Sequence, residues 1–180
     1  MRNKAKRLTD HGLPTFQWVP VKGAKRSYEL RSGTNVVGRM RWPQTFGSLA
    51  EAEFGDDHWT FKRGGFLRPR VTVRSQGANE DSAVLELSFG GGGLLRIRDG
   101  RCLRWIRQGF WSQRFAFADE KGVELVLIEP KFGIMRRSGA VRTAREASSL
   151  RELALLILVG WYVTMLIADD DAAAVAVCCG

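Results

Sequence analysis

The sequence predicts a mainly β fold, in which about twelve antiparallel strands form a closed barrel and one hydrophobic helix follows near the C-terminus. Two observations carry this prediction. Short runs rich in Val, Phe, Trp, Leu and Ile alternate with turn signals from about Thr15 to Thr143, a pattern typical of strands joined by tight connections. A single run without charge then covers residues 153–168, long enough for a helix rather than a strand.

The strands are separated by turn chemistry such as Ser32-Gly33, Asp99-Gly100 and Lys121-Gly122. They are expected near 15–21, 26–32, 35–42, 49–54, 57–63, 66–75, 82–89, 93–98, 101–107, 110–118, 122–129 and 131–137. Closing such a meander into a barrel removes its exposed edges. The predicted organisation is therefore a basic flexible arm at 1–14, a barrel domain at 15–168 and a tail at 169–180.

Alternation of apolar and polar residues gives the strands an inner and an outer face. The Asp99-Gly100 turn shows which residues share a face. A two-residue loop would place Leu95 opposite Arg104 and mix the faces, whereas a three-residue loop with a bulge pairs apolar with apolar residues. In the register set by the three-residue loop, Arg96, Arg98 and Arg104 point outward. Continuing the same alternation of inner and outer residues through the Gln108-Gly109 turn places Arg114 on the outer face as well.

The hydrophobic helix is expected over 150–168, with Ser148 or Ser149 as its cap and Glu152 in its first turn. Its apolar residues go all the way round, which is typical of a helix buried on every side. Residues 172–180 are small and apolar, and are expected either to extend the helix or to fray.

Positive charge is unevenly placed along the chain, whose net charge is +9. All 28 Lys and Arg and 16 of the 19 acids lie within residues 1–152, which leaves this part of the chain with an excess of 12 positive charges. A basic body of this kind suits an anionic partner such as a phospholipid surface or nucleic acid. The alternative is that the positive charge has no specific partner and only keeps the protein soluble.

The candidate anion-binding or lipid-binding residues are Arg96, Arg98, Arg104 and Arg114. Guanidinium groups bind phosphate oxygens in pairs, so several arginines on one outer face favour a multivalent anion. The alternative is an ordinary solvated sheet face, partly neutralised by neighbours such as Glu86. Nucleic acid is the less expected partner, because Trp105 and most aromatic residues near these arginines fall on the inner face.

The sequence contains no catalytic or metal-binding pattern. The two histidines are His11 and His58 and there is no Cys-x-x-Cys, so no set of residues has the spacing of zinc ligands. His58 has acids beside it but no assignable serine or cysteine nucleophile, and is expected to be an exposed strand residue. We expect no catalytic residue, metal or cofactor, and a protein that is not an enzyme. Three cysteines and no apolar leader favour the cytoplasm, with association to a membrane as an option.

A basic arm, about twelve antiparallel strands and then one hydrophobic helix form an unusual order of elements. With strand-like stretches such as 36–42 and the run 153–168, this order resembles the tubby C-terminal-like superfamily, which includes tubby domains, phospholipid scramblases and LURP-one-related proteins. The resemblance covers about residues 15–168. It implies a closed antiparallel barrel of about twelve strands enclosing one C-terminal hydrophobic helix, and a tendency to bind anionic lipids.

Inside such a barrel, Gly160 would allow the close approach of a strand, and Trp161 or Tyr162 would need a polar partner. Asp169, Asp170 and Asp171 follow the helix and lack the spacing of a calcium loop.

Two functions fit these features. The first is a non-enzymatic binding module for anionic lipid headgroups or phosphate-bearing ligands at the inner membrane face. The alternative is a tail-anchored membrane protein with a cytosolic β domain and the helix as its single span, an orientation that the positive-inside rule supports. As a helix, residues 153–168 would be about 24 Å long, which is shorter than the roughly 30 Å hydrocarbon core of a bilayer. Charged residues also flank this run at both ends. The buried helix is therefore preferred.

Overall fold

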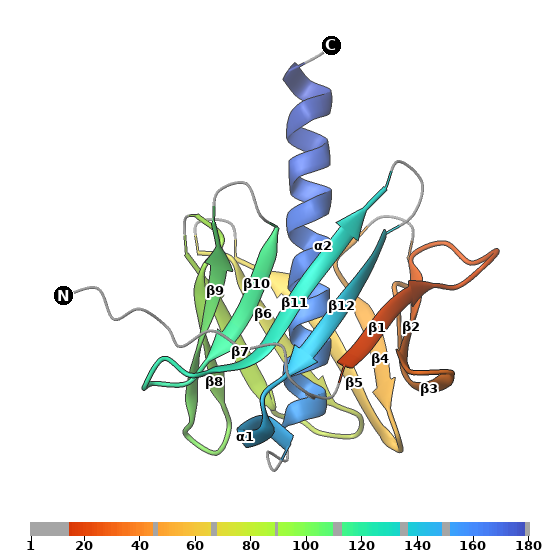
Figure 1. Cartoon of the computed structure of the whole chain (residues 1–180). Coiled ribbons are helices and arrows are strands. Elements are labelled where there is room, and N and C mark those ends of the chain that lie inside the picture. Colours follow the sequence, from red (N-terminus) through yellow and green to blue (C-terminus); the bar gives the residue numbers. More distant parts are fainter. Residues whose placement is uncertain are drawn as a thin grey trace.

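The computed structural model describes residues 15–44, 47–65, 68–88, 90–109, 113–133, 137–148 and 152–178, and Figure 1 shows a barrel of strands with a helix along its axis. The strands are β1 Thr15–Pro20, β2 Ser27–Ser32, β3 Asn35–Arg41, β4 Ala50–Phe54, β5 Asp57–Gly64, β6 Arg70–Ser75, β7 Ala83–Leu87, β8 Gly93–Ile97, β9 Cys102–Gln108, β10 Arg114–Ala118, β11 Glu124–Phe132 and β12 Arg137–Thr143. Each strand pairs antiparallel with its neighbours in the chain, and β1 also pairs with β12. The predicted closed twelve-strand barrel is confirmed. The expected arm at 1–14 lies outside the described residues.

Helix α2, Leu153–Cys178, fills the interior of this barrel. Every residue from 155 to 166 is buried. The ring of Trp161 stacks on Trp18 of β1, with 5.4 Å between ring centroids, and meets Tyr28 of β2 edge-on at 5.4 Å. A helix about 10 Å across that is apolar on all sides occupies the space that a barrel of this size would otherwise leave hollow. The expected central position of the helix is confirmed.

Gly160 is a point of very close approach between α2 and the barrel wall. A Cβ atom there would lie 2.2 Å from Cδ1 of Ile128 on β11, so a larger residue forces repacking. The hydroxyl of Tyr162 donates a hydrogen bond to the backbone carbonyl of Ser48. The indole N–H of Trp161 has no hydrogen-bond partner among the described residues. The close approach expected at Gly160 and the polar partner expected for Tyr162 are both confirmed.

The turn between β8 and β9 has the predicted three-residue loop. Leu95 pairs with Leu103 across the two strands, and the N–H of Ile97 donates to the carbonyl of Arg101 at 2.9 Å. Apolar residues of both strands therefore share the inner face, and the arginines between them face outward.

The predicted boundaries of the last two strands, 122–129 and 131–137, are wrong. β11 continues through Pro130 to Phe132, and β12 occupies Arg137–Thr143. Beyond Ile128, β11 pairs with β12 alone, so Pro130 lies where the strand has one neighbour, a position that tolerates proline. Gly139 lies within β12, and a Cβ at this position would lie 2.8 Å from the ring of Trp161, so the strand needs glycine there.

The ends of α2 also differ from the prediction. The helix begins at Leu153, and Glu152 precedes it rather than lying in its first turn; the carbonyl of Glu152 accepts the N–H of Leu156 at 2.9 Å. The predicted start at 150 and the Ser149 cap lie outside the described residues, and Ser148, the other predicted cap, belongs to a separate short helix and not to the start of α2. At the other end α2 runs to Cys178, so the helical extension is confirmed for residues 172–178. A short helix that was not predicted, α1 Arg145–Ser148, lies between β12 and α2.

Candidate anion-binding surface

The four candidate arginines lie on the outer face of the barrel, as predicted. Arg96 belongs to β8, Arg104 to β9 and Arg114 to the start of β10, while Arg98 lies in the β8–β9 turn, and all four are exposed. The register of β8 and β9 makes Arg96 and Arg104 diagonal neighbours. Arg114 lies beside the end of β9, about 13 Å further along that strand than Arg104. The barrel therefore brings two of the four together and spreads the others along the sheet.

Carboxylates from neighbouring segments reach three of these guanidinium groups. The ion pairs are Arg98 with Glu80 (2.7 Å), Arg96 with Glu86 (3.8 Å) and Arg114 with Glu129. Arg104 instead donates to the backbone carbonyl of Asp119 at 3.4 Å. Among these acids only Glu86 was identified from the sequence, because the others are brought close by the sheet. An anion approaching this patch competes with carboxylates that are already in place.

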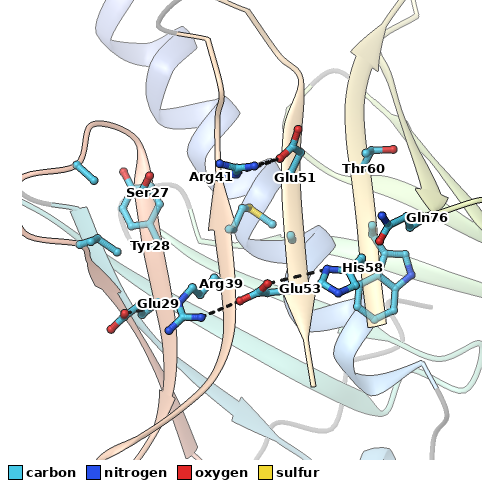
Figure 2. A pocket seen from close by; sticks show the side chains of 15 residues that line it. Ser27, Tyr28, Glu29, Arg39, Arg41, Glu51, Glu53, His58, Thr60 and Gln76 are labelled. Atoms are coloured by element: carbon cyan, nitrogen blue, oxygen red, sulfur yellow. Dashed lines mark hydrogen bonds and ion pairs between the residues drawn. The ribbon is translucent and has the colours of Figure 1, made fainter. Parts of the chain in front are cut away.

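A groove of about 800 Å³ crosses the outer face of strands β2 to β5 (Figure 2). Opposite charges alternate along it. Arg39 donates to Glu53 at 3.0 Å, and Arg41 donates to Glu51 at 2.6 Å. His58 is half exposed and lies 3.9 Å from Glu53, which confirms its expected place as an exposed strand residue. Because its charges compensate one another, this groove offers little attraction to an anion.

A second groove, of about 740 Å³, lies where the β1–β2 loop meets β11 and β12. We call it the lysine groove, because its lining includes Lys22, Lys25 and Lys131 together with Ser138, and no carboxylate among the described residues. All three lysines are exposed, and none forms an ion pair within the described part of the chain. Sequence reasoning missed this groove because Lys131 is far from the loop in the chain. The two lysines within one short turn were the available signal.

The aspartates after the apolar run meet arginines at the barrel rim where α2 leaves it. Asp169 accepts a hydrogen bond from Arg26 at 2.9 Å and also pairs with Arg137. Asp170 accepts from Arg63 at 2.7 Å. These three arginines, the arginine collar, come from the β1–β2 loop, β12 and β5. The collar fixes how deeply α2 sits in the barrel, and nothing in the sequence pattern assigned the aspartates this role.

Other chemistries have little support in the described residues. No group of three or more His, Cys, Asp or Glu side chains within them could hold a metal ion. Trp105 is only 2% exposed, so its ring is not available to stack on a nucleic-acid base. The helical segment Leu153–Ala174 is long and apolar enough to cross a bilayer, and 67% of its most apolar window is buried inside the barrel.

Comparisons of the chain with protein-family models, with curated proteins and with solved structures found no match in any of the three. The observed architecture, a closed twelve-strand antiparallel barrel with one C-terminal helix, fits that of a tubby-like barrel.

Proposed function

We propose that this chain is a non-enzymatic binding module of the tubby-like class, which binds anionic lipid headgroups or other phosphate-bearing ligands at the inner face of a membrane. The observation that carries the proposal is the difference in charge between the two ends of the barrel. A protein that is basic at one end is attracted to, and oriented by, an anionic surface.

The loops alternate between the two ends because the strands run alternately up and down. At the end where α2 leaves the barrel, the charged loop residues that the structure describes are all basic: Lys22, Lys25, Arg26 and Arg68. At the opposite end the loops carry Asp56, Glu80, Asp81, Asp99, Asp119 and Glu120 beside Arg98, Arg101 and Lys121. The end where α2 leaves is therefore the one that suits an anionic surface.

The packed interior supports binding on the outside of the barrel. Residues 155–166 of α2 occupy the space within the strands, and rings such as Phe61, Trp105 and Phe115 pack into the same core. A ligand of headgroup size then has the outer grooves and the loop ends as its places to bind. Binding there needs charge attraction and no chemical step.

A tail-anchored protein is the second candidate, favoured by the length and apolar composition of Leu153–Ala174. Moving this helix into a bilayer would empty the barrel and expose inner side chains such as Trp18 and Leu85 to water. It would also separate Asp169 and Asp170 from the arginine collar. We therefore propose reversible association with a membrane surface.

Sedimentation with vesicles tests the proposed function. The protein is expected to pellet with phosphatidylcholine vesicles that contain about 30% phosphatidylserine, to stay in solution with pure phosphatidylcholine, and to be released by salt. Equal pelleting with both kinds of vesicle, or with neither at low salt, would contradict the proposal.

A further inference from the structure

The lysine groove and the free end of α2 lie at the same end of the barrel. Arg26, in the loop that carries Lys22 and Lys25, is joined to Asp169 at 2.9 Å, which places this loop beside the point where α2 leaves. Figure 1 shows the helix continuing well beyond the strands at that end. The loop and the helix end are therefore neighbours on one surface.

The lysine groove differs in charge from the groove of Figure 2, although their volumes are similar. In the groove of Figure 2, Arg39 and Arg41 are matched by carboxylates at hydrogen-bond distance. In the lysine groove three ammonium groups meet no described carboxylate. Ammonium groups are compact point charges that bind phosphate oxygens without a fixed geometry, so this groove suits a phosphate group better than the other.

The loop that carries two of the lysines is held in a fixed shape. The N–H of Val21 donates to the carbonyl of Ser27 at 2.9 Å, and the N–H of Ala24 donates to the carbonyl of Val21 at 3.3 Å. The guanidinium of Arg26 packs over the ring of Trp42 at 5.1 Å and is tied to α2. Because Arg26 is held towards the helix, the exposed lysines on either side of Gly23 and Ala24 remain free to meet a ligand.

The projecting part of α2 lies beside these charges and is apolar in sequence after Asp171. No charged residue follows Asp171 in the helix, which ends Ala-Ala-Ala-Val-Ala-Val-Cys, and Ala172, Ala173 and Ala174 are exposed. Ion pairs with the collar neutralise Asp169 and Asp170, so that of the three aspartates Asp171 alone keeps an unpaired negative charge within the described residues. Buried apolar area and electrostatic attraction to anionic lipids both contribute to the binding of a segment at a membrane surface, and this end of the barrel offers both.

We propose that the lysine groove binds the phosphate of an anionic lipid headgroup while the end of α2 beside it enters the same leaflet. This inference rests on the proposed function and names the surface that performs it. The barrel then stands with its helix-exit end on the membrane, and the acidic loops of the other end face away.

The test compares two variants with the same change in charge, by sedimentation with vesicles containing about 30% phosphatidylserine. The variant K22Q/K25Q/K131Q changes only exposed side chains of the lysine groove, and R96Q/R98Q/R104Q is the matched control. Since each basic residue near such a surface changes binding about fivefold, the lysine variant is expected to bind about 100-fold more weakly than the wild type. The control is expected to lose fivefold at most. Equal losses of vesicle affinity, or a larger loss in the arginine variant, would contradict the assignment of the lysine groove as the binding site but not the proposed function. Failure of the wild type to bind would overturn both.

A second pair of variants tests the helix end. A173E places a charge in the exposed part of α2, and T34E places the same charge in the β2–β3 turn at the opposite end. A173E is expected to weaken vesicle binding about tenfold and T34E to leave it within about twofold. Equal effects would show that the helix end stays outside the bilayer.

The source of the phosphate is tested by competition. Inorganic phosphate at about 10 mM, with ionic strength matched by chloride, is expected to leave the protein on the vesicles, because free phosphate provides no bilayer for the helix end. Release by phosphate at matched ionic strength would identify a site for soluble phosphate and overturn the lipid assignment.

Discussion

Arg26 donates a hydrogen bond to Asp169 at 2.9 Å and so joins the β1–β2 loop to α2 across 143 positions of the chain. Arg137 meets the same carboxylate from β12, and Arg63 holds the next aspartate from β5. An uncharged helix in an apolar barrel has little to fix its position along the barrel axis. These ion pairs at the rim provide that fixed point.

The collar predicts unequal effects for adjacent aspartates. D169N removes the charge that two arginines share, and is expected to lower the free energy of unfolding by about 1 kcal/mol, since the groups are partly exposed. D171N is the matched control, because Asp171 is exposed and forms no ion pair within the described residues; it should change stability by less than about 0.5 kcal/mol. Urea unfolding measures both. Equal effects would mean that the collar does not hold the helix.

The contact between Gly160 and Ile128 predicts a specific rescue. In G160A the new methyl group would lie 2.2 Å from Cδ1 of Ile128, and the overpacking is expected to cost about 1–3 kcal/mol of stability. I128V removes that Cδ1 atom. The substitution G160A should therefore cost less in an I128V background than in the wild type, when a double-mutant cycle is measured by urea unfolding. Additive effects would show that α2 does not touch β11 at this point.

Tyr162 predicts a loss of stability in alkali. Burial raises its pKa from 10 to about 12. Between these values the folded protein holds a proton that the unfolded chain has lost, so the free energy of unfolding falls as pH rises through this range, by at most about 1.4 kcal/mol for each pH unit. Below pH 10 the contribution is complete.

The variant Y162F tests this pH dependence. It loses the hydrogen bond to Ser48, about 1 kcal/mol at neutral pH, but its unfolding midpoint in urea should depend less on pH between 10 and 12. Burial also raises the pKa of Tyr28, so part of the slope remains. A slope identical to that of the wild type would contradict the burial of the Tyr162 hydroxyl.

The fold was more predictable than the surface, for a physical reason. Period-two alternation and turn residues act locally, so strand number, the β8–β9 register and the apolar helix could all be inferred from neighbouring residues. The boundaries of the last two strands were predicted wrongly because they depend on distant partners: β10 does not pair with β11 at Pro130, and the ring of Trp161 lies close to Gly139.

The same distinction applies to the candidate sites. The outward direction of Arg96 and Arg104 follows from parity along a strand and was predicted correctly. Their acidic partners, the collar around Asp169 and the meeting of Lys131 with the β1–β2 loop depend on which strands become neighbours. Closure of the barrel decides this, because it brings β1 beside β12.

The central claim is that the protein associates with membranes while α2 stays inside the barrel. The most direct measurement is fractionation of cells that express the chain, with the membrane pellet washed first in high salt, then in alkaline carbonate and last in detergent. Our account predicts that salt or carbonate releases the protein, because charge and a shallow helix end hold it there. Release by detergent alone would show that α2 spans the bilayer, and would contradict the account.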